Sequence, residues 1–338
     1  MSTSDSAISP PAGLVDLASA RVGGVALLAN DEFFAEKENL LKPGRGIFIP
    51  DKYTDHGKWM DGWETRRRRP PGHDWCVVRL GLRGMIRQVD IDTNHFLGNH
   101  PPFASIDAIG TTSDFPTEAA AVDGLSWTPV LKQSPLSPGS QNLFAITNGD
   151  TWTHVRLNIF PDGGVARFRV YGIVVPDWTK VKPSELVDLV AVENGGVPLA
   201  CSDMFFSSMN NLIMPGRAEN MGDGWETKRR RGPGHDWIIL KLGLPGTIRK
   251  VEVDTNHFKG NYPDTCSIEG CAAPDAIIED LTSTKTSWSE VLPKTKLQAD
   301  TRHFFERELS SVENCSHIRL NIYPDGGVSR LRVWGTVA

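Results

Sequence analysis

The 338-residue chain lacks the features that mark membrane proteins, secreted proteins and nucleic-acid-binding proteins. No apolar run approaches the roughly 20 residues that a membrane-spanning helix requires. The first ten residues lack the positively charged start and the apolar stretch of a secretory signal. Lysine and arginine number 36 against 41 for aspartate and glutamate, which argues against nucleic acid or an anionic membrane as the main partner. We therefore expect a soluble, cytoplasmic protein.

Cysteine is scarce and shows no pattern. The chain has five cysteines, and no two of them have the Cys-x-x-Cys spacing. A disulfide framework in a secreted protein usually uses an even number of cysteines. We expect reduced cysteines that serve packing, with a thiol nucleophile or a zinc site as the alternative.

What the chain does have is the same set of motifs twice, in the same order and at nearly constant spacing. The first copies of the three longest motifs are Asp61–Trp75, Asp92–Phe96 and His154–Val165, and the second copies are Asp223–Trp237, Asp254–Phe258 and His317–Val328. A repeat this long is one folded unit rather than a turn of a solenoid. We predict a tail at 1–11, a first repeat at 12–172, a proline-containing linker at 173–183 and a second repeat at 184–338.

The first copy differs from the second by an insertion. It carries about ten extra residues between Arg45 and Asp61, which have no counterpart between Arg217 and Asp223. Insertions of this kind are tolerated at the surface, so we expect an exposed loop there.

The motifs sit in segments with the period of a β-strand. His154–Ile159 alternates polar and apolar residues, Pro161–Gly164 has the composition of a turn, and Ala166–Val170 alternates again, which predicts a β-hairpin. Trp75–Leu80 and Val89–Asp92 indicate further strands. The chain has 32 glycines and 23 prolines between such short segments. The expected fold is all-β, an antiparallel sandwich or jelly roll in each repeat.

The predicted hairpin places polar side chains on one face. Arg156 and Asn158 face away from the apolar residues of their strand, and the return strand adds Arg167 and Arg169. Guanidinium groups bind carboxylates through two parallel hydrogen bonds, so these residues are candidates for an anion site. The alternative is a solvated face without a function. The second copy keeps Arg319, Asn321, Arg330 and Arg332.

A second candidate group lies around the tryptophan of the first motif. Glu64 follows Trp63 and precedes the four arginines Arg66–Arg69. Four arginines suggest phosphate binding, but the adjacent acid and the acidic chain make that reading weak. We expect Glu64 to pair with an arginine and take Glu64 and Arg67 as candidate substrate contacts, with purely structural ion pairs as the alternative. Their second-copy equivalents are Glu226 and Arg229.

The natural candidates for proton transfer are two pairs of histidine and aspartate. His73 precedes Asp74, and Asp92 stands three residues before His95. Histidine titrates near neutral pH, and a neighbouring carboxylate can fix its tautomer. The second-copy equivalents are His235, Asp236, Asp254 and His257. Neither spacing is a metal signature, so we assign no metal ligand and expect no cofactor. A divalent cation and simple bracing of loops stay open as alternatives.

These motifs resemble the allantoicase family over almost the whole chain, from Leu14 to Gly335. The resemblance rests on Gly62–Thr65 with the arginines that follow, Gly72–Trp75, Asp92–Asn99 and Arg156–Gly164, each present twice. It implies two jelly-roll domains of the galactose-binding-like kind in tandem, assembled into a homo-oligomer. It also implies a hydrolase of purine breakdown that converts allantoate and water into ureidoglycolate and urea.

The chemistry of allantoate suggests roles for the candidates. Its single carboxylate requires a cationic clamp, to which we assign Arg156, Arg167 or Arg169. Its two ureido groups require hydrogen bonds, for which Asn158 and Glu64 are suited. Cleavage of the carbon–nitrogen bond requires an acid for the departing nitrogen and a base for water, which we assign to the two histidine–aspartate pairs. The second-copy equivalents are equally eligible, so one repeat, both repeats or a composite site could catalyse.

The competing class is a non-catalytic binding module. Jelly rolls of this kind hold sugars and other polar ligands at the tips of their loops, often on an aromatic platform. Trp63 and Trp225 would be the platforms in such a protein.

Overall fold

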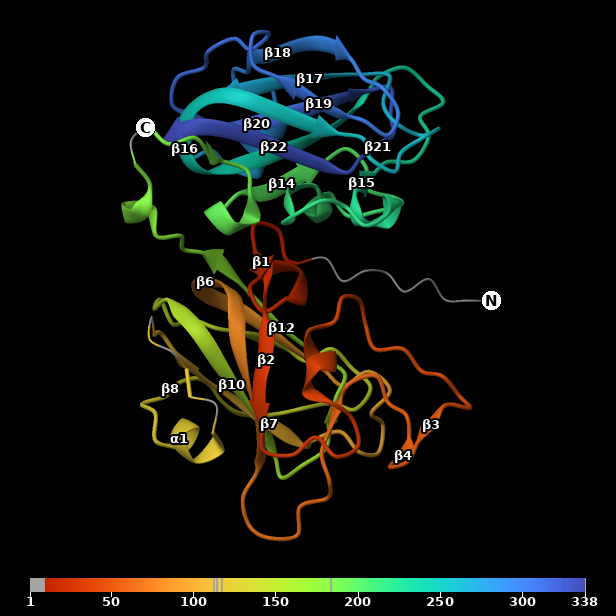
Figure 1. Ribbon diagram of the computed structural model, residues 1–338, viewed down its shortest axis with the longest axis vertical. Coiled ribbons are helices and arrows are strands. Elements are labelled where there is room, and N and C mark those ends of the chain that lie inside the picture. Colours follow the sequence, from red (N-terminus) through yellow and green to blue (C-terminus); the bar gives the residue numbers. More distant parts are fainter. Residues whose placement is uncertain (1–9, 112, 114, 117, 183, 338) are drawn as a thin grey trace. The chain divides into compact units, whose positions relative to one another are not determined.

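The computed structural model describes residues 10–111, 113, 115–116, 118–182 and 184–337, and the chain divides into two compact units between Val175 and Pro176 (Figure 1). Both units are built of β-strands, in agreement with the predicted all-β fold. Strand β12 of the first unit continues to Val174 and so includes the first two residues of the predicted linker. A short 3-10 turn at Trp178–Lys180 follows.

The first unit contains one main set of strands and several short elements (Figure 1). The main strands are β1 (Val15–Asp16), β2 (Val25–Ala29), β6 (Asp74–Asp92), β7 (Phe103–Ile109), β8 (Thr128–Pro135), β9 (Leu143–Ala145), β10 (Trp152–Phe160) and β12 (Arg167–Val174). The short elements are β3 (Tyr53–Thr54), β4 (Gly57–Lys58), β5 (Trp63–Glu64), β11 (Gly164–Val165), the helix α1 (Ala119–Asp123) and 3-10 turns at Ala20–Val22 and Lys37–Leu41.

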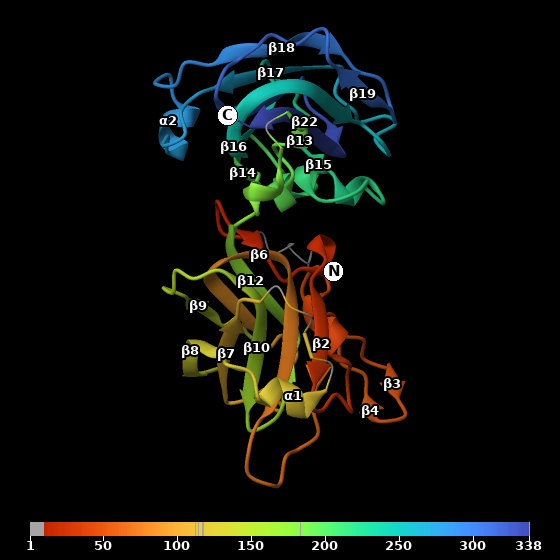
Figure 2. The same ribbon diagram turned by 60° about the vertical axis from the view of Figure 1, so that its left-hand side comes forward.

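One long strand holds the two layers of the first unit together (Figure 2). Strand β6 has 19 residues, where the sequence predicts two separate strands. Its first part pairs with β2 and β10, and its last part pairs with β9 and β12, so the strand passes from one layer into the other. At the bend, a Cβ on Gly81 would lie 2.3 Å from the Val22 carbonyl oxygen, and one on Gly84 would lie 2.4 Å from the Ile173 carbonyl oxygen. Only glycine fits this close backbone approach.

The predicted hairpin between 154 and 170 is wrong. Strands β10 and β12 do not pair with each other, because Ile159 of β10 pairs with Asp74 at the start of β6 and Arg167 of β12 pairs with Asp92 at its end. The connection between them crosses from one layer to the other, and its own short strand β11 pairs with β5 instead. Arg156 and Asn158 therefore lie in a different layer from β12.

The second unit repeats the same pairing. Its main strands are β13 (Val187–Asp188), β14 (Val197–Cys201), β16 (Asp236–Asp254), β17 (Thr265–Cys271), β18 (Ser289–Lys296), β19 (Arg302–Phe305), β20 (Cys315–Tyr323) and β22 (Arg330–Val337). Its short elements are β15 (Trp225–Glu226), β21 (Gly327–Val328), the helix α2 (Ile278–Thr282) and 3-10 turns at Val192–Asn194, Met209–Ile213 and Met221–Asp223. Strand β16 is again 19 residues long and pairs first with β14 and β20, then with β19 and β22. The prediction of two homologous domains is confirmed.

The core of each unit is formed where the sequence places its apolar residues. Val155, Leu157 and Ile159 of β10 are completely buried, as their alternation predicts, and each contributes about 1.5–3 kcal/mol through removal of its side chain from water. Trp63 and Trp225 are also completely buried. Their indole nitrogens donate hydrogen bonds to backbone oxygens, so they are core residues rather than exposed platforms for a ligand.

The insertion and the cysteines both agree with what the sequence predicts. The insertion of the first repeat forms the exposed β3–β4 hairpin, as expected. At the tip of this hairpin His56 stacks on Phe33 with 4.1 Å between ring centres. All five cysteines are free, and four of them are buried, which agrees with a packing role.

Asp90 in β6 is a buried acid with an incomplete set of partners. Its side chain is fully inaccessible, and one carboxylate oxygen accepts a hydrogen bond from Gln141 at 2.7 Å. The other carboxylate oxygen has no hydrogen bond with any residue that the structure describes. Burial raises the pKa of Asp90 to about 6, with the nearby Asp92 carboxylate acting in the same direction and Arg169 opposing it. A raised pKa means that the folded state favours the protonated acid. The contribution to stability is therefore complete below the unfolded pKa, near 4, and is lost as the pH rises through about 6.

We predict that Asp90→Asn stabilises the protein at pH 8 by about 2 kcal/mol, because the amide carries no charge to bury. The gain should vanish near pH 4, where wild-type Asp90 is protonated. Thermal unfolding of both proteins across this pH range measures the difference. The matched control is Glu252→Gln in the second repeat, where the acid accepts from Arg302 at 3.1 Å and the amide should destabilise at pH 8. A destabilised Asp90→Asn protein at pH 8 would contradict the assignment.

Candidate functional site

A chain of polar side chains crosses one layer of each repeat. In the first repeat it consists of His73, Ser105, Asp107, Arg156 and Asn158. Alternate residues of β10 share a face, and the register sets Arg156 opposite Asp107 and Asn158 opposite Ser105 of β7. His73 stands just before the start of β6, next to the end of β10. Residues far apart in the sequence are thus neighbours on one face.

The hydrogen bonds fix the orientation of this network. The Asp107 carboxylate accepts from Asn158 Nδ2 at 2.9 Å and from Arg156 Nη2 at 3.0 Å. Because a carboxylate can only accept, the amide nitrogen of Asn158 must face it, and the amide oxygen then lies 3.3 Å from His73 Nε2. His73 therefore carries its proton on Nε2. Its Nδ1 has no hydrogen-bond partner within the described part of the chain and is free to accept a proton.

The second repeat has the same arrangement with a longer acid. Glu269 accepts from Asn321 Nδ2 at 2.9 Å and from Arg319 Nη2 at 2.7 Å, and the Asn321 amide oxygen lies 3.2 Å from His235 Nε2. Ser267 contacts Asn321 through its hydroxyl group. The agreement between the two repeats shows that the carboxylate–amide–imidazole order is a property of the fold.

A cavity of about 450 Å³ opens on the network of the second repeat. His235, Ser267, Glu269, Arg319 and Asn321 are among the residues that line it. Its volume lies within the range of small-molecule sites. Guanidinium, imidazole, amide and carboxylate groups converge there, which suits a small polar anion.

No side-chain hydrogen bond or ion pair of the described residues joins Asp74 to His73 or Asp236 to His235. Asp74 is buried and accepts hydrogen bonds from Arg68 Nη1 at 2.8 Å and from Asn30 Nδ2 at 3.1 Å. Its equivalent Asp236 is bound by Arg230 and by Ser202. The histidine is instead oriented by Asn158 or Asn321, so the predicted pairing of His73 with Asp74 is wrong.

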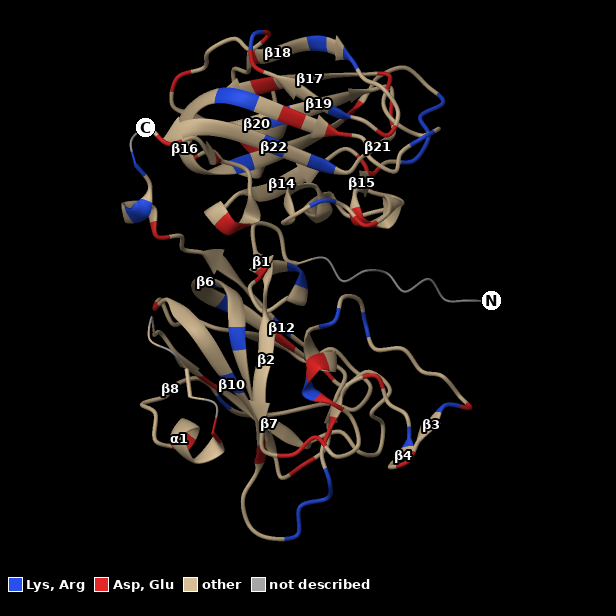
Figure 3. Cartoon of the chain, in the orientation of Figure 1, with Lys and Arg blue, Asp and Glu red and all other residues tan. Residues whose placement is uncertain are grey.

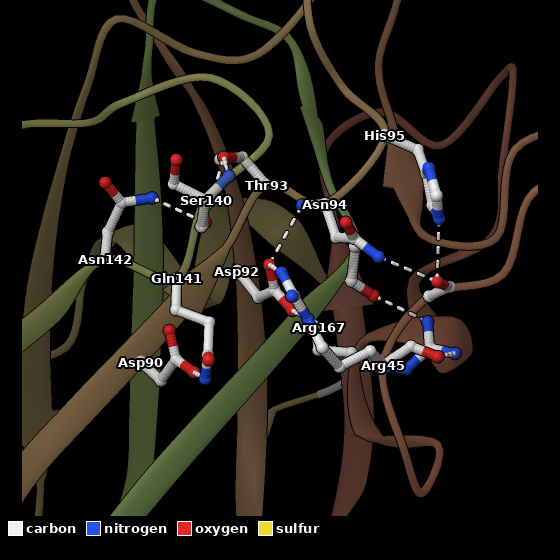
Figure 4. A network of polar contacts seen from close by, with 12 residues as sticks. Arg45, Asp90, Asp92, Thr93, Asn94, His95, Ser140, Gln141, Asn142 and Arg167 are labelled. Atoms are coloured by element: carbon white, nitrogen blue, oxygen red, sulfur yellow. Dashed lines mark hydrogen bonds and ion pairs between the residues drawn. The ribbon is translucent and has the colours of Figure 1, made fainter. Parts of the chain in front are cut away.

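Asp92 and His95 form a separate cluster at the other end of β6 (Figure 4). Asp92 accepts from Arg45 Nη2 and from the Asn94 backbone nitrogen, both at 2.9 Å. His95 Nε2 lies 3.1 Å from the Gly46 carbonyl oxygen, and no direct hydrogen bond or ion pair among the described residues joins Asp92 or His95 to His73. The cluster connects the loop after β6 to the loop before the insertion.

The second repeat repeats this bracing cluster. Asp254 accepts from the Asn256 backbone nitrogen at 2.8 Å and lies 3.8 Å from Arg217. His257 Nε2 lies 2.9 Å from the Ala218 carbonyl oxygen. His95 and His257 have φ angles of 68° and 71°, a left-handed conformation that side chains other than glycine rarely adopt. Both histidines hold it with the same bond to a backbone oxygen.

The predicted gathering of Arg156 with Arg167 and Arg169 is wrong, because the latter two lie in the other layer. Arg167 is buried and binds Asp61 through Nη2 at 2.6 Å. Arg169 donates to the carbonyl oxygens of Lys42 and Gly44. Their second-copy equivalents behave alike: Arg330 binds Asp223, and Arg332 binds the carbonyl oxygens of Met214 and Gly216. These arginines hold loops to the sheet.

Contrary to expectation, Glu64 forms no ion pair with any arginine in the described part of the chain. It accepts from Asn99 Nδ2 at 2.6 Å, and burial raises its pKa. Glu226 in the second repeat is likewise bound by Asn261, and burial raises its pKa too. The arginine run itself lies on the loop between β5 and β6 (Figure 3). Arg67 is exposed there.

Arg67 and its equivalent Arg229 have no partner among the residues that the structure describes, whereas other arginines of the run form ion pairs. Arg66 binds Asp31, and Arg68 binds Asp74. The two unpaired guanidinium groups are therefore available to an external anion.

Sequence reasoning missed Asp107 and Glu269. Each follows a serine two positions earlier, at the same place in both copies, on a strand that alternates small apolar and polar residues. That alternation was a usable signal. It needed the knowledge that β7 lies beside β10, which no local pattern supplies.

The described residues contain no group of three or more histidine, cysteine, aspartate or glutamate side chains placed to hold a metal ion. In the network itself, the carboxylate and Nε2 of the imidazole are already engaged by Asn321 and Arg319. None of the helices in the described part of the chain is long and apolar enough to cross a membrane.

Comparison with known proteins finds one family across both repeats. The family model "Allantoicase repeat" matches residues 15–175 and 187–338. The chain is 50% identical to a probable allantoicase of Burkholderia mallei over 323 residues, which cover 96% of this chain and 94% of that protein. It is 49% identical to the allantoicase of Dictyostelium discoideum over 323 residues, which cover 94% and 86%. The crystal structure of allantoicase from Saccharomyces cerevisiae superposes with a TM-score of 0.81 at 38% identity, covering 96% of this chain and 93% of that one.

We predict that Arg167→Leu lowers the free energy of unfolding by about 3–5 kcal/mol, because it leaves Asp61 buried without its counter-charge. Chemical denaturation measures this loss. The control is Arg67→Leu, an exposed arginine without a partner, for which the change should stay within about 0.5 kcal/mol. An Arg167→Leu protein of normal stability but with weaker substrate binding would show instead that Arg167 is a substrate clamp.

Proposed function

The chain belongs to the allantoicase family, and we propose that its reaction takes place in the cavity around His235. Membership makes the chain a hydrolase of purine catabolism that converts allantoate and water into ureidoglycolate and urea. The observation that carries the placement is the hydrogen-bond chain from Glu269 through Asn321 to His235. It leaves the second imidazole nitrogen, Nδ1, without a hydrogen bond from any described residue, beside the cavity.

Arg319 binds the carboxylate of allantoate in this proposal. Its Nε and Nη2 face Glu269, whereas Nη1 has no hydrogen bond among the described residues. Arg319 also lies over the ring of Trp288 at 4.8 Å, which holds the guanidinium plane in place. A carboxylate at Nη1 forms a charge-assisted hydrogen bond of about 1.5–3 kcal/mol. Arg229 stands on the loop before β16 and is not among the residues that line the cavity.

His235 moves the proton that the reaction requires. Water forms a bond to the central carbon of allantoate, and the bond from this carbon to one ureido nitrogen breaks. His235 Nδ1 accepts the proton that water loses and delivers it to the departing nitrogen, so that urea leaves as a neutral molecule. Asn321 is a positioning residue, because its amide oxygen accepts a hydrogen bond from His235 Nε2 and so selects the tautomer whose lone pair is on Nδ1.

The competing class, a carbohydrate-binding module, has little support in the geometry. It depends on Trp63 and Trp225 as exposed platforms, and both are completely buried. We further propose that the protein is cytoplasmic, which the five free cysteines support, and that it forms a homo-oligomer. The exposed aromatic residues Phe205 and Phe206 offer one apolar surface for such an assembly.

We predict that His235→Asn lowers kcat for urea release from allantoate by a factor of about 10² to 10⁴, while KM changes little, because asparagine cannot transfer the proton. Colorimetric detection of urea gives both constants. The control is His56→Asn at the tip of the inserted hairpin, which should leave kcat unchanged. Normal turnover by His235→Asn would remove the imidazole from the mechanism.

We predict that dialysis against a chelator leaves urea release unchanged, since Glu269 and the His235 imidazole are engaged within the network rather than arranged around an ion. The assay compares treated and untreated enzyme, with zinc, manganese or magnesium added back afterwards. Loss of activity that one of these ions restores would show that a divalent cation is required.

A further inference from the structure

The polar networks of the two repeats differ at one nitrogen, Nη1, of their arginines, Arg156 and Arg319. In the first repeat, Arg156 Nη1 donates to Asp123 at 3.3 Å, in addition to the bonds that its other nitrogens form with Asp107. Asp123 is the last residue of α1, and the last residue of α2 is Thr282, which hydrogen-bonds within its own helix. In the second repeat the equivalent nitrogen, Arg319 Nη1, has no hydrogen bond or ion pair with any described residue. The first repeat thus places one of its own carboxylates where a substrate carboxylate would bind.

The arginines are otherwise placed alike, so the difference is not one of position. Arg156 lies 4.9 Å above the ring of Trp127, and Arg319 lies 4.8 Å above the ring of Trp288. His73 and His235 also pack against the rings of Phe160 and Tyr323 in the same tilted way, with 4.6 Å between ring centres in both repeats. Any difference in function between the two networks must therefore come from the side chains that differ between the repeats.

Two further residues that line the cavity, Lys294 and Tyr323, are replaced by other residue types in the first repeat. Lys294 of β18 lies 3.9 Å above the ring of Tyr323, whose hydroxyl oxygen is 3.1 Å from Ser267 Oγ. Both residues line the cavity. The strand registers set Gln133 at the position of Lys294 and Phe160 at the position of Tyr323. The first repeat has neither the ammonium group nor the hydroxyl group.

The charge balance favours an anion in one network and disfavours it in the other. Around the second network, Arg319 and Lys294 offset Glu269 and Glu290. Around the first, Arg156 forms ion pairs with two carboxylates, those of Asp107 and Asp123. An incoming carboxylate would add to a surplus of negative charge in the first repeat and to a neutral set in the second.

We propose that only the network of the second repeat binds and hydrolyses allantoate, with Lys294 and Tyr323 as substrate contacts, and that Asp123 closes the equivalent network of the first repeat. The proposal rests on the function proposed above. Lys294 adds a second positive charge for the substrate carboxylate, and the Tyr323 hydroxyl group offers a hydrogen bond to a ureido group beside His235. In the first repeat the same framework serves as a structural ion-pair cluster.

The residues of the first repeat supply the test variants in the full-length protein. Lys294→Gln and Tyr323→Phe introduce what the first repeat already carries at these positions, so the fold accepts both. We expect Lys294→Gln to raise KM for allantoate by at least about tenfold, as the loss of a charge-assisted contact implies. The reciprocal variants Gln133→Lys and Phe160→Tyr should leave kcat and KM within a factor of two of wild type.

Replacing His73 and His235 separately tests whether only one repeat catalyses, independently of whether the proposed site is correct. We expect His73→Asn to retain at least half of wild-type kcat, while His235→Asn loses most of it, with melting temperatures measured to show that both proteins are folded. Equal losses of kcat in the two variants, or a normal KM in Lys294→Gln, would overturn the proposal that only the second repeat catalyses. Neither result would contradict the proposed reaction itself. Normal activity in a third protein that carries both His73→Asn and His235→Asn would overturn the proposed site itself.

Discussion

The bend in the long strand of each repeat is the constraint on which the rest of the structure depends. Strand β6, like β16, passes from one layer to the other, so its two ends lie in different layers near the turn that joins β10 to β12. The histidine just before the strand and the aspartate at its last position are therefore placed by one backbone path. The bend is possible because Gly81 and Gly84 allow backbone contacts that a side chain would block. The polar network and the bracing cluster both follow from it.

Much of this arrangement was predictable from the sequence, because each motif occurs twice and the two copies can be compared position by position. The number of domains, their all-β character and the burial of Val155, Leu157 and Ile159 follow from alternation and repetition. So does the meeting of Arg156 and Asn158 on one face. The pairing of strands did not follow, since alternation says which way a side chain points and not which strand lies alongside. A turn-like segment between two alternating runs was therefore mistaken for a hairpin.

The sequence predicted several residues of the candidate site but not the hydrogen bonds and ion pairs between them. His73, Arg156 and Asn158 were named from their chemistry, and the structure brings them together. Arg167 and Arg169 have the same chemistry, but burial against Asp61 and against loop carbonyl groups gives them a structural role. The acid that orients the whole network, Asp107 or Glu269, stands on a strand that carries no motif. Adjacency in sequence suggested Asp74 as the partner of His73, whereas the contact is made across 85 residues by Asn158.

The contact between Asp123 and Arg156 has an evolutionary consequence. Tandem duplication produces two copies of every residue, and one copy is then released from selection on its original task. A carboxylate at the end of a short, exposed helix is a small change by which such a copy could retire, because it neutralises the arginine without disturbing the sheet beneath. On the proposal made above, the surrounding scaffold stays intact, so a few substitutions would open the first repeat to an anion again.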